Sequence, residues 1–525
     1  MSVVSPQARL ARAASMLAAA TVASRLLGLL REIVVAALFG ASDAKAAYVI
    51  GYYLPFFVQR LLLGGTLSIV LIPTLADVLA RGERAEMQRV TAQMFTAVLG
   101  VGVAMVVAGQ IAAPLLVPIA APGFTADPHQ LALTVHLTRV NFLAMFFLAL
   151  SVYATAYLQA QRRFTPPAVA PIVFNLVTIA GTVWLGPRIG IVGLAVAWIA
   201  GTAAQFLVQV PSLLAGGFRF RLALDWSHPA VRTVRHLAAP AMLGLAIVEI
   251  NAYVGRFFAS LLPGAPGVNA VAALDYAYEV VQAPVGILAL SVATVLFPGM
   301  SQSAAAGDRP ALRASTALGL RSVVFLMLPV SVGLVVFARP LIRLVFERGE
   351  FTPATTAVVA SCLTAYAIGL VPMAAYYVVT RSYYALHDMR TPMATGSGMV
   401  TLNAVLAYAF MRVWGPAGIA LASAVVAFVN VGVLLAILSR RLGALEGRRT
   451  VAQVVRTGTA TVLAVGAAWA IVHAGLPAPA DRAGEAAVLG AAAGAAGLVY
   501  LAACARLRVE EIGLLRSLLC RPSSR

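Results

Sequence analysis

The sequence predicts an all-α polytopic membrane protein, and three of its features point to that fold class. Of the 525 residues, 61% are hydrophobic and only 11% are charged, and the mean hydropathy is +0.90. Soluble domains carry about 25% charged residues. Apolar stretches of about 20 residues, long enough to cross a bilayer as a helix, follow one another from end to end. Short loops rich in arginine separate these stretches.

The apolar stretches divide into fourteen expected transmembrane helices. The first begins after Arg9 and Arg12, and its length and internal arginines distinguish it from a cleaved signal peptide. Thr-Pro loops precede the fifth and eleventh spans, and Gly-rich turns lead into the sixth and twelfth. Spans thirteen and fourteen are rich in alanine and glycine, which favours close helix packing. The expected spans are 14–38, 47–76, 91–117, 131–158, 168–186, 191–214, 235–261, 270–299, 317–337, 354–379, 392–413, 417–438, 454–474 and 485–505.

The distribution of basic residues predicts that both termini lie in the cytoplasm. With the N-terminus inside, 26 Lys and Arg residues fall on the cytoplasmic side, 7 (Lys45 among them) on the outside, and 5 within spans. That asymmetry is the topogenic positive-inside pattern, reinforced by anionic lipid at the cytoplasmic face. It also accounts for the net charge of +19. The expected partners are therefore membrane lipids and not nucleic acid.

An internal repeat predicts two lobes of parallel orientation. The segment AYLQAQRRFTPPAVAPIVFNL from Ala156 resembles YYALHDMRTPMATGSGMVTLNAVL from Tyr383, about 226 residues later. Six spans separate the copies, and an even number preserves orientation, as in transporters built from parallel repeats around a central cavity. The expected domains are an N-lobe at 1–218 (spans 1–6), a C-lobe at 219–442 (spans 7–12), and 443–525 with spans 13–14 and a cytoplasmic tail.

Arginines inside the apolar spans are the main candidates for a binding site. Arg25 and Arg31 lie in the first span and Arg60 in the second. A cation at the bilayer centre costs roughly 2.5–3.5 kcal/mol on insertion scales, so such residues usually line a polar cavity. A planar guanidinium also offers two parallel donors to phosphate oxygens. The alternative for each arginine is a snorkelling or ion-paired structural charge.

The full set of intramembrane candidates contains both charge signs. We expect substrate contacts from Arg25, Arg31, Arg60, Arg139 and Arg256 with Ser24, and gating or ion-pair roles for Glu32, Glu249, Asp275 and Glu279. Bends are expected at Pro55, Gly64 and Gly65 in the second span and at Pro284 and Gly286 in the eighth. A static kink is the alternative for each of these positions. Within the fifth and eleventh spans, Asn175 and Asn403 are expected to join helices by hydrogen bonds.

Several short motifs resemble the MurJ/MviN family of lipid II flippases. They are SRLLGLLRE at 24–32, LPFFVQRLLLGGTLS at 54–68, APGF at 121–124, RRFTPPAVAPIVFN at 162–175, VLFPGMS at 295–301, FERGEFT at 346–352 and YALHDMRTP at 384–392. The resemblance implies the multidrug/oligosaccharidyl-lipid/polysaccharide exporter fold with fourteen spans. It also implies translocation of undecaprenyl-pyrophosphate-linked peptidoglycan precursor to the outer leaflet of a bacterial inner membrane. Enzymes of cell-wall synthesis would be partners.

The resemblance extends to some site residues and fails at others. Arg25 and Arg31 match two first-span arginines of the family, and Arg139 matches a basic position in the fourth span. The family's paired arginines after LPN are Gln59-Arg60 here, with Phe56 in place of Asn. Its acidic position near the start of that span is Ala46, and its eighth-span Asp-Arg pair is Tyr278-Glu279. Our hypothesis is that Glu249, Arg256 and Glu279 replace that pair as a conformational lock.

The sequence indicates a transporter and not an enzyme. It contains no P-loop and no Ser/His/Asp set. Its three cysteines and six histidines are scattered, so we expect no metal site and no cofactor. Three other functions compete with lipid II translocation: a flippase for another polyprenyl-linked glycan of the O-antigen or capsule type, a cation-coupled multidrug exporter, and a non-transporting scaffold of envelope assembly.

Overall fold

The computed structural model describes residues 6–61, 84–223, 249–251, 253–264, 267–444, 446–473 and 482–513, with side chains from residues 19 and 88 onward in the first two ranges. Contacts within the chain divide it into two compact units. Unit 1 is Met1–Ala272 with Arg348–Thr352, and unit 2 is Ala273–Glu347 with Pro353–Arg525. The helical residues 249–251 and 253–260 therefore group with unit 1. The three-part division into lobes and a C-terminal pair stays a prediction.

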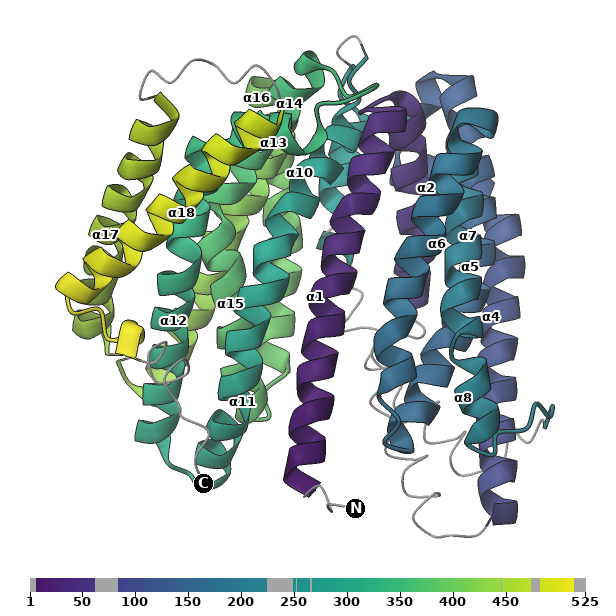
Figure 1. The fold of residues 1–525 in the computed structure, drawn as a ribbon, viewed down its shortest axis with the longest axis horizontal. Coiled ribbons are helices and arrows are strands. Elements are labelled where there is room, and N and C mark those ends of the chain that lie inside the picture. Colours follow the sequence, from purple (N-terminus) through teal and green to yellow (C-terminus); the bar gives the residue numbers. More distant parts are fainter. Residues whose placement is uncertain are drawn as a thin grey trace. The chain divides into compact units, whose positions relative to one another are not determined.

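Unit 1 is built from long helices connected by tight corners (Figure 1). Its labelled elements are α1 Pro6–Phe39, α2 Asp43–Gln59, α4 Arg84–Ala120, η2 Pro122–Ala126, α5 Pro128–Ala160, α6 Thr165–Ile189, α7 Ile191–Leu207 and α8 Val210–Ala215. Helix α5 packs against α2, α4 and α7, and α6 packs against α1 and α7. Helix α1 packs against α6, and near its C-terminal end Val35 also joins a buried cluster with Tyr48 of α2 and Leu194 of α7.

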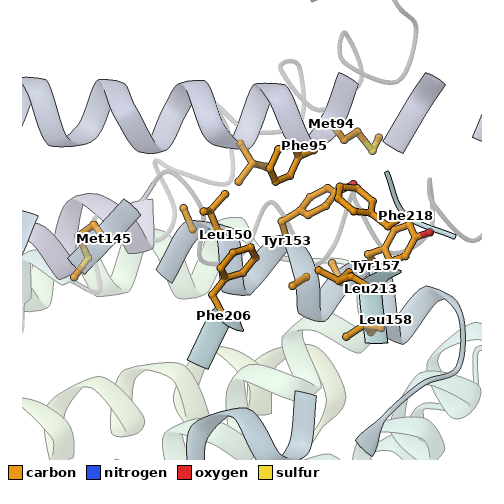
Figure 2. Packing of buried hydrophobic residues seen from close by; sticks show 14 of the residues in the cluster. Met94, Phe95, Met145, Leu150, Tyr153, Tyr157, Leu158, Phe206, Leu213 and Phe218 are labelled. Carbon is orange, nitrogen blue, oxygen red and sulfur yellow. The ribbon is translucent and has the colours of Figure 1, made fainter. Parts of the chain in front are cut away.

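An aromatic core holds one end of unit 1 together (Figure 2). Phe95 of α4 meets Tyr153 of α5 with ring centroids 5.5 Å apart, and Phe218 after α8 meets Tyr157 at 5.4 Å. Each tyrosine hydroxyl is satisfied by a backbone carbonyl: Tyr153 donates to Thr91 at 2.8 Å and Tyr157 to Gly216 at 3.2 Å. Burying rings while satisfying their hydroxyls yields apolar stabilisation without a desolvation cost.

Unit 2 contains most of the second half of the chain. Its elements are α10 Ala270–Pro284, η3 Val285–Ala289, α11 Leu290–Ala305, α12 Arg309–Val336, α13 Ala338–Phe346, α14 Pro353–Ile368, α15 Leu370–Ala385, α16 Arg390–Leu442, α17 Gly447–His473 and α18 Arg482–Arg506. Helix α15 packs against α11, α12 and α16, and α17 packs against α12 and α18 (Figure 1).

The predicted fold class is confirmed. Within the described ranges, nine helices are long and apolar enough to cross a membrane, or ten if the bent pair α14 and α15 forms one span. The predicted total of fourteen stays a prediction, because parts of the second and seventh expected spans lie outside those ranges.

The internal repeat appears as repeated backbone geometry within the two units. Gly190 separates α6 from α7 with φ 62° and ψ −148°, and Gly415 bends α16 with φ 56° and ψ −135°. Three residues after each of them a glycine permits close approach: an added Cβ would lie 2.7 Å from Leu185 C at Gly193 and 2.2 Å from Phe410 O at Gly418. Left-handed φ and such proximity both favour glycine. The expected Gly-rich turns therefore fold alike.

The loops ahead of α6 and α16 repeat as well. Two residues after the helix before each loop comes a residue with positive φ, Arg162 at 60° and His387 at 56°. The next residue in each copy bonds back to the last turn of that helix, Arg163 N to Leu158 O at 2.8 Å and Asp388 N to Tyr383 O at 3.0 Å. This is the backbone pattern of a Schellman cap. The sequence repeat thus corresponds to one repeated helix ending.

Close backbone contacts join several loops of unit 1, and we call them the glycine clasp. Glu350 N donates to Ala37 O at 2.9 Å, and Asn269 N donates to Ala41 O at 2.7 Å. A Cβ on Gly349 (φ +57°) would lie 2.1 Å from Ala37 O. One on Gly123 would lie 1.8 Å from Ser260 O. Two motifs singled out in the sequence, APGF and FERGEFT, therefore supply glycines that let backbones touch.

Candidate functional site

A cluster of charges connects α1 with the first turn of α2, and we call Arg31, Glu32, Lys45 and Asn175 the Glu32 cluster. Glu32 Oε1 accepts from Arg31 Nε at 3.3 Å and Nη2 at 3.0 Å, and Glu32 Oε2 lies 3.4 Å from Lys45 Nζ. The side chains of Arg31 and Glu32 are 15% and 12% exposed, and that of Lys45 is 3% exposed. One carboxylate is therefore shared by two cations in a largely buried setting.

Arg31 is fixed on further sides by α6 and α7. Its Nη1 donates to Asn175 Oδ1 at 3.2 Å, and its guanidinium lies 5.0 Å from the Trp198 ring centroid and 5.8 Å from that of Phe174. Stacking of this kind on aromatic rings stabilises a desolvated cation. The arginine is thus held in one orientation before any ligand arrives.

Asn175 joins α6 to α1, which confirms its expected role in helix association. Its Nδ2 donates to the backbone oxygen of Pro171 at 2.9 Å, and to the backbone oxygen of Ser24 at 3.3 Å and its hydroxyl at 3.4 Å. The predicted site residues Ser24 and Arg31 therefore meet through one amide, and Glu32 is joined to them through Arg31.

Arg25 differs from Arg31 although both lie on α1. The Arg25 side chain is exposed, and among the residues that the structure describes it has no hydrogen-bond or salt-bridge partner. An exposed cation in an apolar helix retains its full capacity to bind an anion. Of the two first-span arginines, Arg25 is the one available to a ligand and Arg31 is the one already engaged.

Three contacts line up between α2 and the helical residues 249–251 and 253–260. Arg60 Nη1 donates to Glu249 Oε1 at 2.7 Å, and Phe57 meets Tyr253 edge-on at 5.5 Å. The guanidinium of Arg256 lies 3.3 Å from the centroid of the Tyr53 ring. Spacings of three and four residues place each triplet on one helix face. The two helices therefore run antiparallel along this ladder of contacts.

The remaining predicted positions lie in different settings. Arg139 is exposed, and its Nε donates to Gln110 O of α4 at 3.1 Å. On α10, Asp275 is buried and Glu279 is exposed. The lock proposed for Glu249, Arg256 and Glu279 stays a prediction, and so does a gating role for Asp275.

The structure shows a break in helical geometry at one of the two predicted bends. Helix α2 continues through Pro55 to Gln59, whereas Gly64 and Gly65 lie outside the described residues. Pro284 ends α10, and the π-helical turn η3, which contains Gly286, follows it directly. Wider helical turns of this type frequently accompany functional bends. The eighth-span position therefore retains a structural basis for bending.

Sequence reasoning missed Lys45. We expected it in an outer loop, but the structure places it inside α2, with 2% of the residue exposed. The hydrogen bond from Lys45 N to Ser42 Oγ, at 3.3 Å, shows that α2 begins at Asp43 and not near residue 47. One signal was available: Lys45 is the only lysine among 38 basic residues and is flanked by alanines.

The site is suited to binding an anion. Arg25, Arg31 and Lys45 supply positive charge against the single carboxylate of Glu32. Over the part of the chain that the structure describes, no three His, Cys, Asp or Glu side chains gather as metal ligands. A charged oxyanion such as a phosphate is the ligand chemistry that these guanidinium and ammonium groups favour.

The family model and the curated relatives that match this chain all name the same family. A model of the family described as "Lipid II flippase MurJ" matches residues 35–476. The probable lipid II flippase MurJ of Vibrio cholerae is 29% identical over 81% of this chain and 82% of its own length. The probable lipid II flippase MurJ of Rhizobium meliloti is 30% identical over 80% and 78%.

Solved structures agree in fold. A structure described as lipid II flippase MurJ in an inward closed conformation matches with a TM-score of 0.76 at 22% identity, covering 96% of this chain and 99% of that one. An inward-facing multidrug MATE transporter matches with a TM-score of 0.68 at 16% identity, covering 81% and 96%. The family model covers most of the chain, its curated relatives match over about four fifths of their length, and the charges of α1 are those expected from the resemblance. The chain belongs to the MurJ family of lipid II flippases.

Proposed function

We propose that this protein moves lipid II, the undecaprenyl-pyrophosphate-linked peptidoglycan precursor, from the inner to the outer leaflet of a bacterial cytoplasmic membrane by alternating access. Family membership supports the substrate class. The observation that carries the proposal is Arg25, an exposed guanidinium on α1 six residues before an arginine that is already held in place.

The diphosphate of the substrate would be recognised by Arg25 first, with Arg31, Ser24, Arg60, Arg139 and Arg256 as the wider set. A guanidinium stays charged at any physiological pH and donates two parallel hydrogen bonds to phosphate oxygens. Repulsion between unoccupied cations is relieved when the anion enters, so occupancy favours the conformation that encloses it. The polyprenyl tail would remain in the bilayer while the headgroup crosses.

The proposed function also involves the membrane topology of the protein and the enzymes that make and use its substrate. Both termini face the cytoplasm, as the distribution of basic residues predicts. The protein moves its substrate without chemical change, so it acts as a transporter and not as an enzyme. Enzymes that make and use the precursor on either side of the membrane are its functional neighbours.

Complementation tests the proposal directly. In a strain depleted of its own lipid II flippase, we expect growth with the wild-type chain and no growth with Arg25→Ala at equal membrane expression. Arg188→Ala is the matched control, because Arg188 is also exposed but lies at the end of α6 and bonds to Trp184 O. Growth of the Arg25→Ala strain would contradict a headgroup role, and failure of the wild type would contradict lipid II transport.

The competing functions predict other results. A flippase for another polyprenyl-linked glycan would not restore growth but would restore surface display of that glycan. A multidrug exporter would lower the accumulation of cationic dyes, a cargo that Arg25 and the net positive Glu32 cluster disfavour. An envelope scaffold would retain its activity with Arg25→Ala.

A further inference from the structure

Lys45 lies where it can control how Arg31 meets an anion. Its ammonium group is 3.4 Å from Glu32 Oε2 and 5.8 Å from the centroid of the Tyr48 ring. Only 2% of the residue is exposed, so its charge has left water and relies on these neighbours. The position is set by the first turn of α2, which Ser42 caps.

Glu32 occupies the edge of Arg31 that a phosphate would use. One carboxylate oxygen, Oε1, accepts from both Nε and Nη2 of the guanidinium. Because a phosphate oxygen prefers the same fork of donors, the carboxylate and an incoming diphosphate compete for Arg31. Glu32 thus occupies the guanidinium donors that a phosphate oxygen would otherwise take.

We propose that Lys45 is a positioning residue that holds the second oxygen of Glu32, so that the carboxylate releases Arg31 when the diphosphate arrives. This inference rests on the proposed function. With Lys45 present, Glu32 keeps a cationic partner after it leaves Arg31. Without Lys45, release would strand a buried carboxylate, a state that is costly in a low-dielectric setting. Lys45 therefore lowers the cost of exchanging one anion for another.

The net charge of the Glu32 cluster predicts the order of diphosphate affinity among variants. Two cations and one anion give the Glu32 cluster a net charge of +1. Glu32→Gln raises it to +2 and removes the competitor, Lys45→Met lowers it to zero and strengthens the competitor, and the double variant returns it to +1. Diphosphate affinity should therefore be highest in Glu32→Gln, lowest in Lys45→Met, and restored toward the wild-type value in the double variant.

The experiment measures binding of undecaprenyl diphosphate to the purified full-length protein in lipid nanodiscs, with neutral undecaprenol as the reference lipid. We expect affinity to rise at least about tenfold in Glu32→Gln and to fall at least about tenfold in Lys45→Met, since one unit charge at contact distance changes an equilibrium by roughly fivefold in water and by roughly a thousandfold near a protein surface. Undecaprenol affinity should not change. Lys45→Arg keeps the charge and should stay near the wild type.

Other binding results would overturn either the role of Lys45 or the proposed function. A double variant as weak as Lys45→Met would make Lys45 a structural residue and overturn the inference. Four equal affinities would overturn it as well. If Lys45→Met does not fold, Glu32→Gln alone still decides, because unchanged affinity there contradicts competition at Arg31. Should the wild type bind both lipids equally, the proposed function fails, and the role of Lys45 fails with it.

Discussion

Single residues with the same side chain have different roles in this protein. Arg31 bonds to Glu32 and Asn175 and stacks on Trp198, whereas Arg25, six residues earlier on α1, has none of these partners. Arg60 pairs with Glu249, and Arg256 stacks on Tyr53. The sequence predicted these four arginines, together with Arg139, as a charged intramembrane set. It did not predict which carboxylate, amide or aromatic ring each arginine contacts, because those contacts depend on how each helix is rotated about its axis.

The Arg60–Glu249 pair should be required as a pair. Glu249 is 9% exposed, and a buried charge that loses its partner costs more than the pair contributes. We expect Arg60→Gln and Glu249→Gln each to reduce complementation of the flippase-depleted strain. The exchange Arg60→Glu with Glu249→Arg should restore much of it. A double exchange no better than either single variant would show that the contact has no functional role.

Elements of unit 1 meet through backbones, and glycine decides where this is possible. The glycine clasp joins the α1–α2 corner to residues 348–352 and to Asn269. At Gly349 the backbone has positive φ and no room for a side chain. At Gly307, between α11 and α12, φ is +70° but open space surrounds the Cβ position. A side chain at Gly307 would therefore meet only backbone strain, whereas one at Gly349 would meet backbone strain and a steric clash.

Gly349→Ala should lower stability more than Gly307→Ala. Both variants force an L-residue into left-handed backbone, at about 1–2 kcal/mol. Only Gly349→Ala also drives a methyl group into Ala37 O, and overpacking typically costs about 1–3 kcal/mol more. The apparent melting temperature in detergent should fall for both and fall further for Gly349→Ala. Equal shifts would mean that the loop yields and that the clasp is not a tight contact.

The two ends of α16 are connected by a charge that responds to pH. Asp388, in the linker before α16, accepts from Thr391 N at 3.0 Å and Thr391 Oγ1 at 2.6 Å, and it pairs with Arg441 at 2.5 Å. Partial burial acts to raise the pKa of Asp388. The bonds from Thr391 and Arg441 outweigh it and lower the pKa from 3.8 to about 2.

Stability from Asp388 should disappear in acid. A lowered folded-state pKa gives stabilisation that is complete above about pH 4 and is lost as pH falls toward 2. Asp388→Asn should therefore melt below the wild type at neutral pH, and the gap should close in that window. Asp308→Asn is the control, because Asp308 caps α12 through Ala311 N at 2.9 Å without a described arginine partner. A gap independent of pH would contradict the ionic role.

The molecule as a whole repeats one design. Arg162 and His387 each adopt a positive φ after a helix, and Gly190 and Gly415 each interrupt the helix with nearly the same angles. An even number of predicted spans between the copies would put each pair on the same side of the membrane. The predicted orientation of all loops can therefore be tested at equivalent positions.

Cysteine labelling tests this topology in intact cells. In a variant lacking Cys362, Cys504 and Cys520, we expect a membrane-impermeant maleimide to label Ile189→Cys and Val413→Cys but not Ala306→Cys or Met389→Cys. All four side chains are exposed. Permeabilised cells should show labelling at every position. Labelling of Ile189→Cys without Val413→Cys would contradict the parallel orientation of the repeat.

The sequence by itself determined the helical membrane fold, the family, the repeat and the set of charged candidates. Hydropathy, the positions of basic loops and the spacing of glycines are local properties, because each depends only on residues close together in the sequence. Only the tertiary structure decided that Arg31 is engaged while Arg25 is exposed, that Glu249 belongs to Arg60, and that Lys45 is a buried member of the site. Arg60 and Glu249 lie on helices distant along the chain, so the angle at which each helix packs, and not its own composition, selects such partners.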